Sequence, residues 1–225
     1  MNNSEFDQYA SDYDKLLKDS LPKGLSEDSY FAEYKIALIA RILEKNNLPA
    51  TILDFGCGSG RSLPHIARYF PQSDISGFDI SSESIKIAAA SNQNINFFSK
   101  LDDIPSQRFD LILAANVFHH IPIGSQAKCV QKCYDALKAG GSLFIFEHNP
   151  LNPVTRRVFE RCPFDVDAEM IFPKTIINLG KSVGFNMHQK SYTLFFPKPL
   201  SALRKFEWLF SRLPFGAQYY VRFQK

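Results

Sequence analysis

The chain has 225 residues, of which 45% are hydrophobic and 22% are charged, and its formal net charge is +3. This composition is typical of a folded globular protein and excludes a disordered or collagen-like chain, while the small net charge argues against a general nucleic-acid-binding protein. We expect one domain that needs neither disulfides nor a metal, because a chain of this length buries enough apolar surface by itself.

The start of the sequence, MNNSEFDQYA, lacks the basic and apolar regions of a signal peptide. No apolar run approaches the roughly 18 residues of a membrane span. Together these features predict a cytoplasmic protein without a transmembrane segment. The four cysteines are too few for a disulfide framework and are expected to be reduced thiols.

Apolar residues recur every three or four positions in two segments, 4–19 and 27–47, which predicts helices there. From residue 51 onward, short apolar runs alternate with helical patterns. The runs predict buried strands at 51–55, 75–80, 95–98, 109–117 and 142–147, and the intervening patterns predict helices at 60–70, 82–91 and 124–138, the last closed by Gly140 and Gly141. This alternation favours a parallel sheet covered on both faces.

After Pro150 the pattern weakens, and residues 150–172 are predicted to form a loop or lid. A helix at 174–183 and a strand from 184 to about 196 follow. The tail predicts a helical stretch and a final strand at 218–223. It holds six of the 26 basic residues and one of the 23 acids, and its apolar helix face lies opposite Arg204, Lys205 and Arg212.

Four interpretations of this tail helix remain open: packing on the sheet between the last two strands, capping an acceptor pocket, forming a dimer face, or lying on a membrane surface. Upstream, Arg156, Arg157 and Arg161 have helical spacing. They either bind a phosphate or carboxylate of an acceptor or form a solvated basic face.

The strongest motif is Leu53-Asp54-Phe55-Gly56-Cys57-Gly58-Ser59-Gly60, at the first strand-to-helix turn. In open parallel sheets, ligands bind beyond the carboxyl ends of the strands, where this turn falls. A dinucleotide site needs G-x-G-x-x-G, but its last position is occupied by Arg61 or Leu63, depending on which glycine begins the motif. A nicotinamide oxidoreductase thereby loses its main support, and a tight turn without a ligand is the other alternative.

The pattern D-x-G-x-G-x-G resembles motif I of the class I S-adenosylmethionine-dependent methyltransferases. Further segments resemble that family in order: Gly77-Phe78-Asp79-Ile80, Phe109-Asp110-Leu111-Ile112 and Leu137-Lys138-Ala139-Gly140-Gly141. The resemblance covers about residues 30–148. It implies a Rossmann-like α/β three-layer sandwich, with helices on both faces of a seven-stranded, mostly parallel sheet whose last strand is antiparallel.

The resemblance also implies S-adenosylmethionine as cofactor, with Asp79 accepting from the ribose hydroxyls. The usual acid after the third strand is replaced by Lys100, so that either Asp102 or a backbone group is expected to contact the adenine. The helix at 4–19 looks like the segment that closes over the cofactor in many members. The expected cofactor-binding residues are Asp54, Phe55, Gly56, Cys57, Gly58, Gly60, Asp79, Ile80, Asp102 and Asn116.

Methyl transfer to a hydroxyl requires a base, and four candidates lie at the ends of the fourth and fifth strands: His119, His120, Glu147 and His148. Each of them either acts on the acceptor or anchors a loop. The tetrad Asn116-Val117-Phe118-His119 lacks the prolines of enzymes that methylate amino groups of nucleic acids. Cys129 and Cys133 share a helix face but not a zinc-finger spacing, so no metal is expected.

We therefore expect a single methyltransferase domain, divided into an N-terminal helical lid (1–48), a cofactor-binding core (49–148), a lid or acceptor loop (149–172) and C-terminal strands with an inserted basic helix (173–225). Residues 147–165 and 216–221 look like a bacterial subgroup associated with cell-surface glycan and glycolipid pathways. O-methylation of a small-molecule or sugar- or lipid-linked acceptor, by a monomer or homodimer, is the resulting hypothesis. A non-catalytic methyltransferase-like partner subunit is the alternative.

Overall fold

The computed structural model of the chain describes residues 28–43, 48–162, 168–196 and 198–225. The predicted helix at 4–19 and the end of the predicted helix at 27–47 lie outside these residues. The rest of that second helix is α3 (Asp28–Ile42).

Seven strands form one sheet in the order β3-β2-β1-β4-β5-β7-β6. β7 is antiparallel to both of its neighbours, and the remaining pairs are parallel. The predicted seven-stranded, mostly parallel sheet with an antiparallel last strand is thereby confirmed. The strands are β1 (Thr51–Phe55), β2 (Asp74–Phe78), β3 (Asn96–Phe98), β4 (Phe109–Ala115), β5 (Leu137–His148), β6 (Asn186–Thr193) and β7 (Gln218–Gln224).

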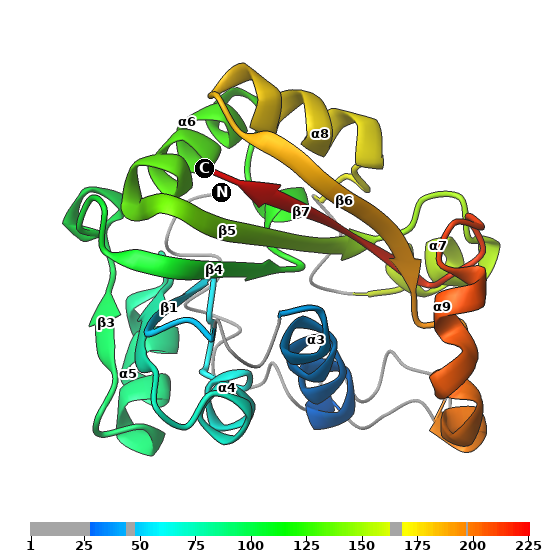
Figure 1. Cartoon of the computed structure of the whole chain (residues 1–225), viewed down its shortest axis with the longest axis horizontal. Helices are drawn as coiled ribbons and strands as arrows, with labels where there is room; N and C mark the ends of the chain where they lie inside the picture. Colours follow the sequence, from blue (N-terminus) through cyan, green and yellow to red (C-terminus); the bar gives the residue numbers. More distant parts are fainter. Residues whose placement is uncertain (1–27, 44–47, 163–167, 197) are drawn as a thin grey trace.

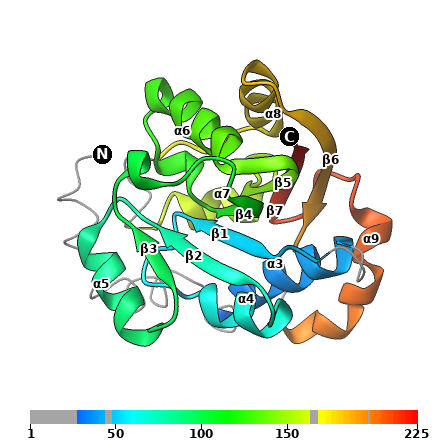
Figure 2. The ribbon, with the colours of Figure 1, turned by 60° about the vertical axis from the view of Figure 1, so that its left-hand side comes forward.

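Helices cover both faces of this sheet, as Figures 1 and 2 show. On one face lie α3, α4 (Leu63–Tyr69) and α5 (Ser82–Ser91), and on the other lie α6 (Ile123–Ala136) and α8 (Pro173–Ser182). Successive side chains of a strand point to opposite faces of the sheet, so that each strand packs against both helix layers. In β1, Ile52 belongs to the apolar cluster on the α3 side, while Leu53 and Phe55 belong to the cluster on the α6 side. The three-layer architecture follows from strands that are apolar on both faces.

Two predictions are wrong, the loop at 150–172 and the glycine end of the helix at 124–138, and each error has a local reason. The segment 150–172 contains a helix, α7 (Pro153–Phe159), whose first turn is capped by the Asn152 side chain accepting from the backbone N–H groups of Val154 and Thr155. Gly140 and Gly141 do not close α6; they lie inside β5, where they exchange backbone hydrogen bonds with Lys225.

An insertion lies between β6 and β7, and it does not form a single helix. A run of 3₁₀ turns, η4 (Lys198–Phe206), is interrupted at Leu200 and leads into the short α9 (Glu207–Phe210). Packing on the sheet, one of the four interpretations of this segment, does not hold for Leu203, Phe206 and Leu209, which are all exposed.

The carboxyl ends of β1, β2, β4 and β5 lie along one edge of the sheet, since these strands are parallel. Because β7 is antiparallel, the insertion that contains η4 and α9 returns to the sheet at this same edge. In the described part of the chain, no helix is long and apolar enough to cross a membrane.

Candidate active site

The glycine loop joins β1 to α4 and is tied to the end of β2. The backbone N–H groups of Gly56 and Cys57 both donate to the Phe78 carbonyl oxygen, at 2.7 and 2.9 Å. Gly56 and Gly58 have φ values of +80° and +53°, in the left-handed region that favours glycine. A Cβ atom on Gly56 would lie 2.4 Å from Val117 Cγ2, whereas one on Gly58 would meet no atom of the described residues within 4 Å. The loop is therefore packed at Gly56 and open at Gly58. Gly60, at φ +85°, completes it.

Asp79 follows β2 and faces the glycine loop. One of its carboxylate oxygens accepts from the backbone N–H of Gly58 at 2.8 Å, and the other accepts from the N–H of Ser81 at 2.9 Å. The next residue, Ile80, is 47% exposed beside it. Asp79 thus fixes the open part of the loop while remaining partly accessible at the edge of the sheet.

Asp54 is the last polar residue of β1 and is buried. Among the residues that the structure describes, none forms a hydrogen bond with its Oδ2 atom. Burial and the nearby charge of Asp79 raise the pKa of this carboxyl group to about 7, although the ammonium group of Lys35 acts in the opposite direction. A buried carboxylate oxygen without a donor is costly, and a ligand that supplies a donor or a positive charge would satisfy it.

Lys35 of α3 was not among the candidates from the sequence, where nothing distinguishes it from an ordinary helical lysine. It is nevertheless 6% exposed. Burial lowers the pKa of its ammonium group to about 8, and the carboxylates of Glu147 and Asp54 partly oppose that shift. The site therefore contains a buried cation among buried acids, which only the packing of α3 against the sheet creates.

The remaining cofactor candidates occupy different places along the edge. Phe55 and Cys57 are buried, and burial raises the pKa of the Cys57 thiol well above its ordinary value. Asn116, at φ +58°, follows β4 and accepts through Oδ1 from the Gln218 side chain at 3.3 Å. Asp102 is exposed on the 3₁₀ turn η1 (Leu101–Asp103), after β3.

Glu147 of β5 and His119, on the 3₁₀ turn η2 (Phe118–His120), form a buried pair. The Glu147 Oε2 atom lies 2.5 Å from His119 Nδ1, and Oε1 accepts from the backbone N–H groups of Val117 and Phe118, at 3.2 and 2.8 Å. Burial alone would raise the pKa of Glu147, but His119, His148 and the Phe118 N–H together hold it below its ordinary value. Glu147 is therefore an ionised group that orients the His119 ring.

The other two histidines cluster around His119. The ring centroid of His120 lies 4.1 Å from that of His119, and the centroid of His148 lies 5.3 Å from it. Phe159 of α7 packs edge-on against both His119 and His148, with centroid distances of 5.6 Å. The structure thus brings all four predicted catalytic candidates together, and α7 covers them.

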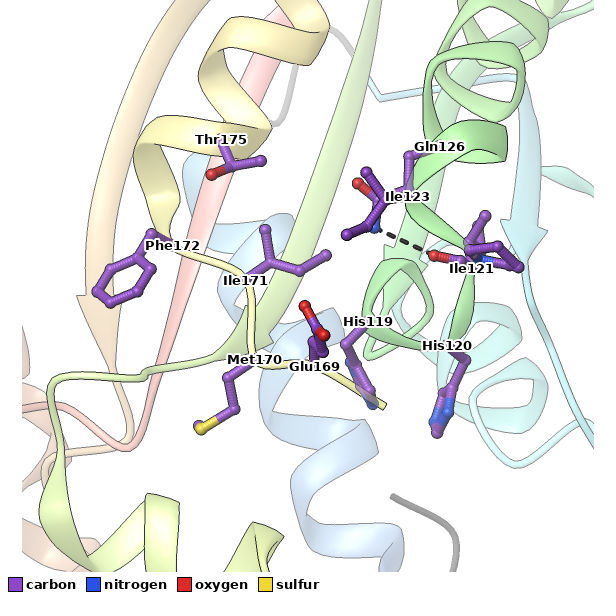
Figure 3. Close-up of a pocket in the computed structure, with 11 residues that line it drawn as sticks. His119, His120, Ile121, Ile123, Gln126, Glu169, Met170, Ile171, Phe172 and Thr175 are labelled. Atoms are coloured by element: carbon purple, nitrogen blue, oxygen red, sulfur yellow. Dashed lines mark hydrogen bonds between the residues drawn. The ribbon is translucent and has the colours of Figure 1, made fainter. Parts of the chain in front are cut away.

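A pocket of about 600 Å³ opens beside His119 and His120. Figure 3 shows the two histidines at one end of it and Thr175 and Phe172 at the other. Its walls are mainly apolar, and Glu169 adds one carboxylate. It is lined by His119, His120, Ile121, Pro122, Ile123, Gln126, Glu169, Met170, Ile171, Phe172 and Thr175. A ligand in this pocket would contact His119 and would lie between the residues that follow β4 (119–123) and those that lead into α8 (169–172).

Comparison with known proteins relates the chain to methyltransferases. Residues 28–190 match the sequence profile of a family described as a methyltransferase domain. The carboxy-S-adenosyl-L-methionine synthase of Campylobacter fetus is 30% identical over 149 residues, which are 63% of this chain and 60% of that protein. The chain spans 60% or less of the length of the curated relatives it matches.

Solved structures resemble the fold along nearly the whole chain. An S-adenosylmethionine-dependent methyltransferase from Archaeoglobus fulgidus gives a TM-score of 0.67 at 15% identity, covering 89% of this chain and 96% of that one. A possible histamine N-methyltransferase from Thermotoga maritima gives 0.66 at 18% identity, covering 98% of both chains. At such identities the likeness concerns the fold.

Proposed function

The chain belongs to the methyltransferase-domain family, and we propose that it transfers a methyl group from S-adenosylmethionine to an oxygen of a small-molecule or sugar- or lipid-linked acceptor. The residues at the edge of the sheet fit this cofactor in two respects. Within the described parts of the chain, Asp54 has a buried carboxylate oxygen without a donor and the glycine loop is open at Gly58. A bound cofactor of this kind supplies a methyl group on a positively charged sulfur.

The chain's own groups would hold the cofactor by charge and by backbone contact. Ionised Asp54 attracts positive charge, and Asp79 offers carboxylate oxygens to hydroxyl groups at the end of β2. Lys35, the buried cation near Asp54 and Glu147, would neutralise an anionic part of the ligand. Phe55, Gly56, Cys57, Gly60, Ile80 and Asn116 would shape the surroundings of the ligand. Asp102 would reach it only from the exposed turn after β3.

The observation that carries the choice of oxygen as acceptor atom is the buried Glu147–His119 pair beside the pocket. A hydroxyl group must lose its proton as it is methylated, and a positioned base accelerates such steps by about 10²–10⁴-fold. Ionised Glu147 can only accept at Nδ1 of His119, so Nδ1 carries the hydrogen and Nε2 would be the atom that takes up the proton of the acceptor. The charge of Glu147 then stabilises the protonated ring. Glu147 is thus proposed as a positioning residue, with His119 as the base and His120 and His148 beside it.

The relatives do not fix the acceptor. One is named a carboxy-S-adenosyl-L-methionine synthase, one a trans-aconitate 2-methyltransferase and one a phosphoethanolamine N-methyltransferase. The acceptor atom is therefore argued from this chain's own site. The apolar walls of the pocket favour an acceptor with an apolar portion next to its hydroxyl group.

The proposal is tested with S-adenosylmethionine carrying a ¹³C-labelled methyl group and a panel of hydroxyl, amine and thiol acceptors. We expect product only with hydroxyl compounds, identified by the carbon chemical shift of a methyl ether. His119→Gln should lower turnover at least about a hundredfold, while His65→Gln, on α4, should leave it unchanged. Methylated amines as the main product would refute the oxygen assignment. Tight cofactor binding without turnover on any acceptor would favour the non-catalytic alternative.

A further inference from the structure

The segment that runs from η4 through α9 to Phe215 directs two of its charged side chains, Arg204 and Glu207, toward the rest of the protein. Glu207 is 4% exposed and accepts from the Tyr34 hydroxyl and from the backbone N–H of Phe195, at 3.0 Å for the latter. Arg204 donates to the Phe196 carbonyl oxygen at 3.0 Å, and its guanidinium lies 4.1 Å from the ring centroid of Tyr30. These contacts fix the segment to α3 and to the end of β6.

The apolar side chains of the same segment face the solvent. Trp208 and Phe215 are each 67% exposed, and Leu209 is 55% exposed. The N-terminal part of α7 lies against this segment, because Asn152 donates to the Phe215 carbonyl oxygen and Thr155 donates to that of Ala217. We call the combined surface the apolar C-terminal surface; it consists of Leu200, Leu203, Phe206, Trp208, Leu209, Leu213 and Phe215, with Val154 of α7 and Leu151, which precedes that helix. Exposed apolar patches of this kind mark interaction sites.

The charged groups around this surface are mainly positive. Lys205 and Arg212 are exposed within the segment, whereas its one acid, Glu207, is buried. The α7 region adds three exposed arginines (Arg156, Arg157 and Arg161) and one exposed acid, Glu160. Aromatic and aliphatic side chains surrounded by cations match the chemistry of an anionic lipid surface, where rings insert at the headgroup level and cations approach phosphates.

We propose that the apolar C-terminal surface binds the surface of an anionic lipid bilayer. A second copy of the chain fits less well, because a twofold contact would pair this surface with itself and bring the cations of both copies to one interface without adding exposed acids. The surface also adjoins the active site: the strand that follows it begins at Gln218, which donates to Asn116. Docking would therefore hold the edge of the sheet near lipid headgroups.

The test uses the full chain, with no cofactor or acceptor, so that its outcome is separate from that of the proposed methyl transfer. Binding is measured by co-sedimentation with vesicles of phosphatidylcholine alone or mixed with phosphatidylglycerol. Trp208 is the chain's single tryptophan, so its fluorescence reports directly on the surface. We expect a blue shift and binding with the anionic vesicles only, weakened by added salt.

Replacing the exposed rings with Trp208→Ser and Phe215→Ser should weaken binding by at least about tenfold. Lys205→Gln and Arg212→Gln should each weaken it by about fivefold. Ile87→Ser and Lys181→Gln, at exposed positions on α5 and α8, serve as matched controls and should change nothing. If the ring variants fail to fold, the Lys205→Gln and Arg212→Gln variants and the Trp208 fluorescence of the unmodified chain still test the proposal.

Three results would overturn the proposal. The first is equal binding to neutral and anionic vesicles, or no binding to either. The second is unchanged binding by the ring and charge variants. The third is a concentration-dependent dimer, seen by sedimentation velocity without vesicles and abolished by Trp208→Ser, which would assign the surface to a second copy.

Discussion

The Glu147 carboxylate lies 2.5 Å from Nδ1 of His119, and both side chains are buried at the edge of the sheet where β4 and β5 end. Replacing the acid by an amide, Glu147→Gln, keeps the shape but removes the charge that stabilises a protonated His119. We expect kcat to fall by about tenfold or more, with little change in the KM for either substrate. Steady-state kinetics at saturating cofactor measure this split.

Glu160→Gln on α7 is the matched control, since that acid is exposed. The thermal midpoint of Glu147→Gln should be recorded as well, because its carboxylate also accepts from two backbone N–H groups. A variant that folds normally and keeps its full kcat would show that methyl transfer occurs by positioning alone.

Asp79 is expected to contribute to cofactor affinity through its carboxylate at the glycine loop. In Asp79→Asn only one oxygen remains for the two backbone donors, Gly58 and Ser81, and the charge is gone. Affinity for S-adenosylhomocysteine, measured by calorimetry, should fall at least about tenfold. Asp74→Asn changes an acid at the opposite end of the same strand, where it pairs with Arg108, and should have no effect. Equal affinities for the two variants would remove the role assigned to Asp79.

The pKa of Asp54, raised to about 7 by burial and by Asp79, predicts a pH dependence of cofactor binding. Ionised Asp54 attracts the positively charged cofactor, so affinity should rise as the pH increases from 6 to 7, by about fivefold. The comparison stays below the pKa of Lys35, about 8, so that the lysine remains charged. Asp54→Asn should bind weakly and lose this pH dependence. A slope that persists in the variant would assign the titration to another group.

The parts of the fold that could be predicted from the sequence are those determined by local pattern. The apolar run at 51–55 and the glycines after it define a strand and a turn whatever surrounds them, and Asp54 and Asp79 follow from their positions at strand ends. The helix α7 was missed although Asn152 and Pro153 are ordinary helix-start residues, because prolines nearby favoured a loop.

The burial of Lys35 and the orientation of the tail depend on tertiary contacts, which the spacing of apolar residues in the sequence does not predict. Lys35 looks solvent-exposed in the sequence, and only the packing of α3 against the sheet buries it near Asp54. The apolar spacing in the tail left packing on the sheet open as one of four interpretations, yet Glu207 and Arg204 make the inward contacts and Trp208 is exposed. Periodicity indicates that an amphipathic segment exists, but not which of its sides the rest of the protein binds.

Gly58→Ala should separate folding from ligand binding. A Cβ atom there would meet nothing within 4 Å, so the substitution costs only the strain of a left-handed backbone, about 1 kcal/mol. Cofactor affinity should nevertheless fall about tenfold or more, because the new methyl group enters the open side of the loop. Gly56→Ala, whose Cβ would clash with Val117, is the contrasting variant and should also destabilise the fold. Thermal unfolding and calorimetry measure the two effects, and unchanged affinity in Gly58→Ala would place the ligand elsewhere.

The pocket beside His119 predicts a substitution that affects the acceptor alone. Thr175 lies at the end opposite the two histidines (Figure 3), and Thr175→Trp would fill part of the cavity without touching the glycine loop. The KM for the acceptor should rise about tenfold or more, since the lost space excludes part of the ligand, while cofactor affinity stays constant. Lys174→Trp places the same ring on the neighbouring exposed position of α8, outside the pocket. If both variants keep the acceptor KM of the unmodified protein, the acceptor does not bind in this cavity.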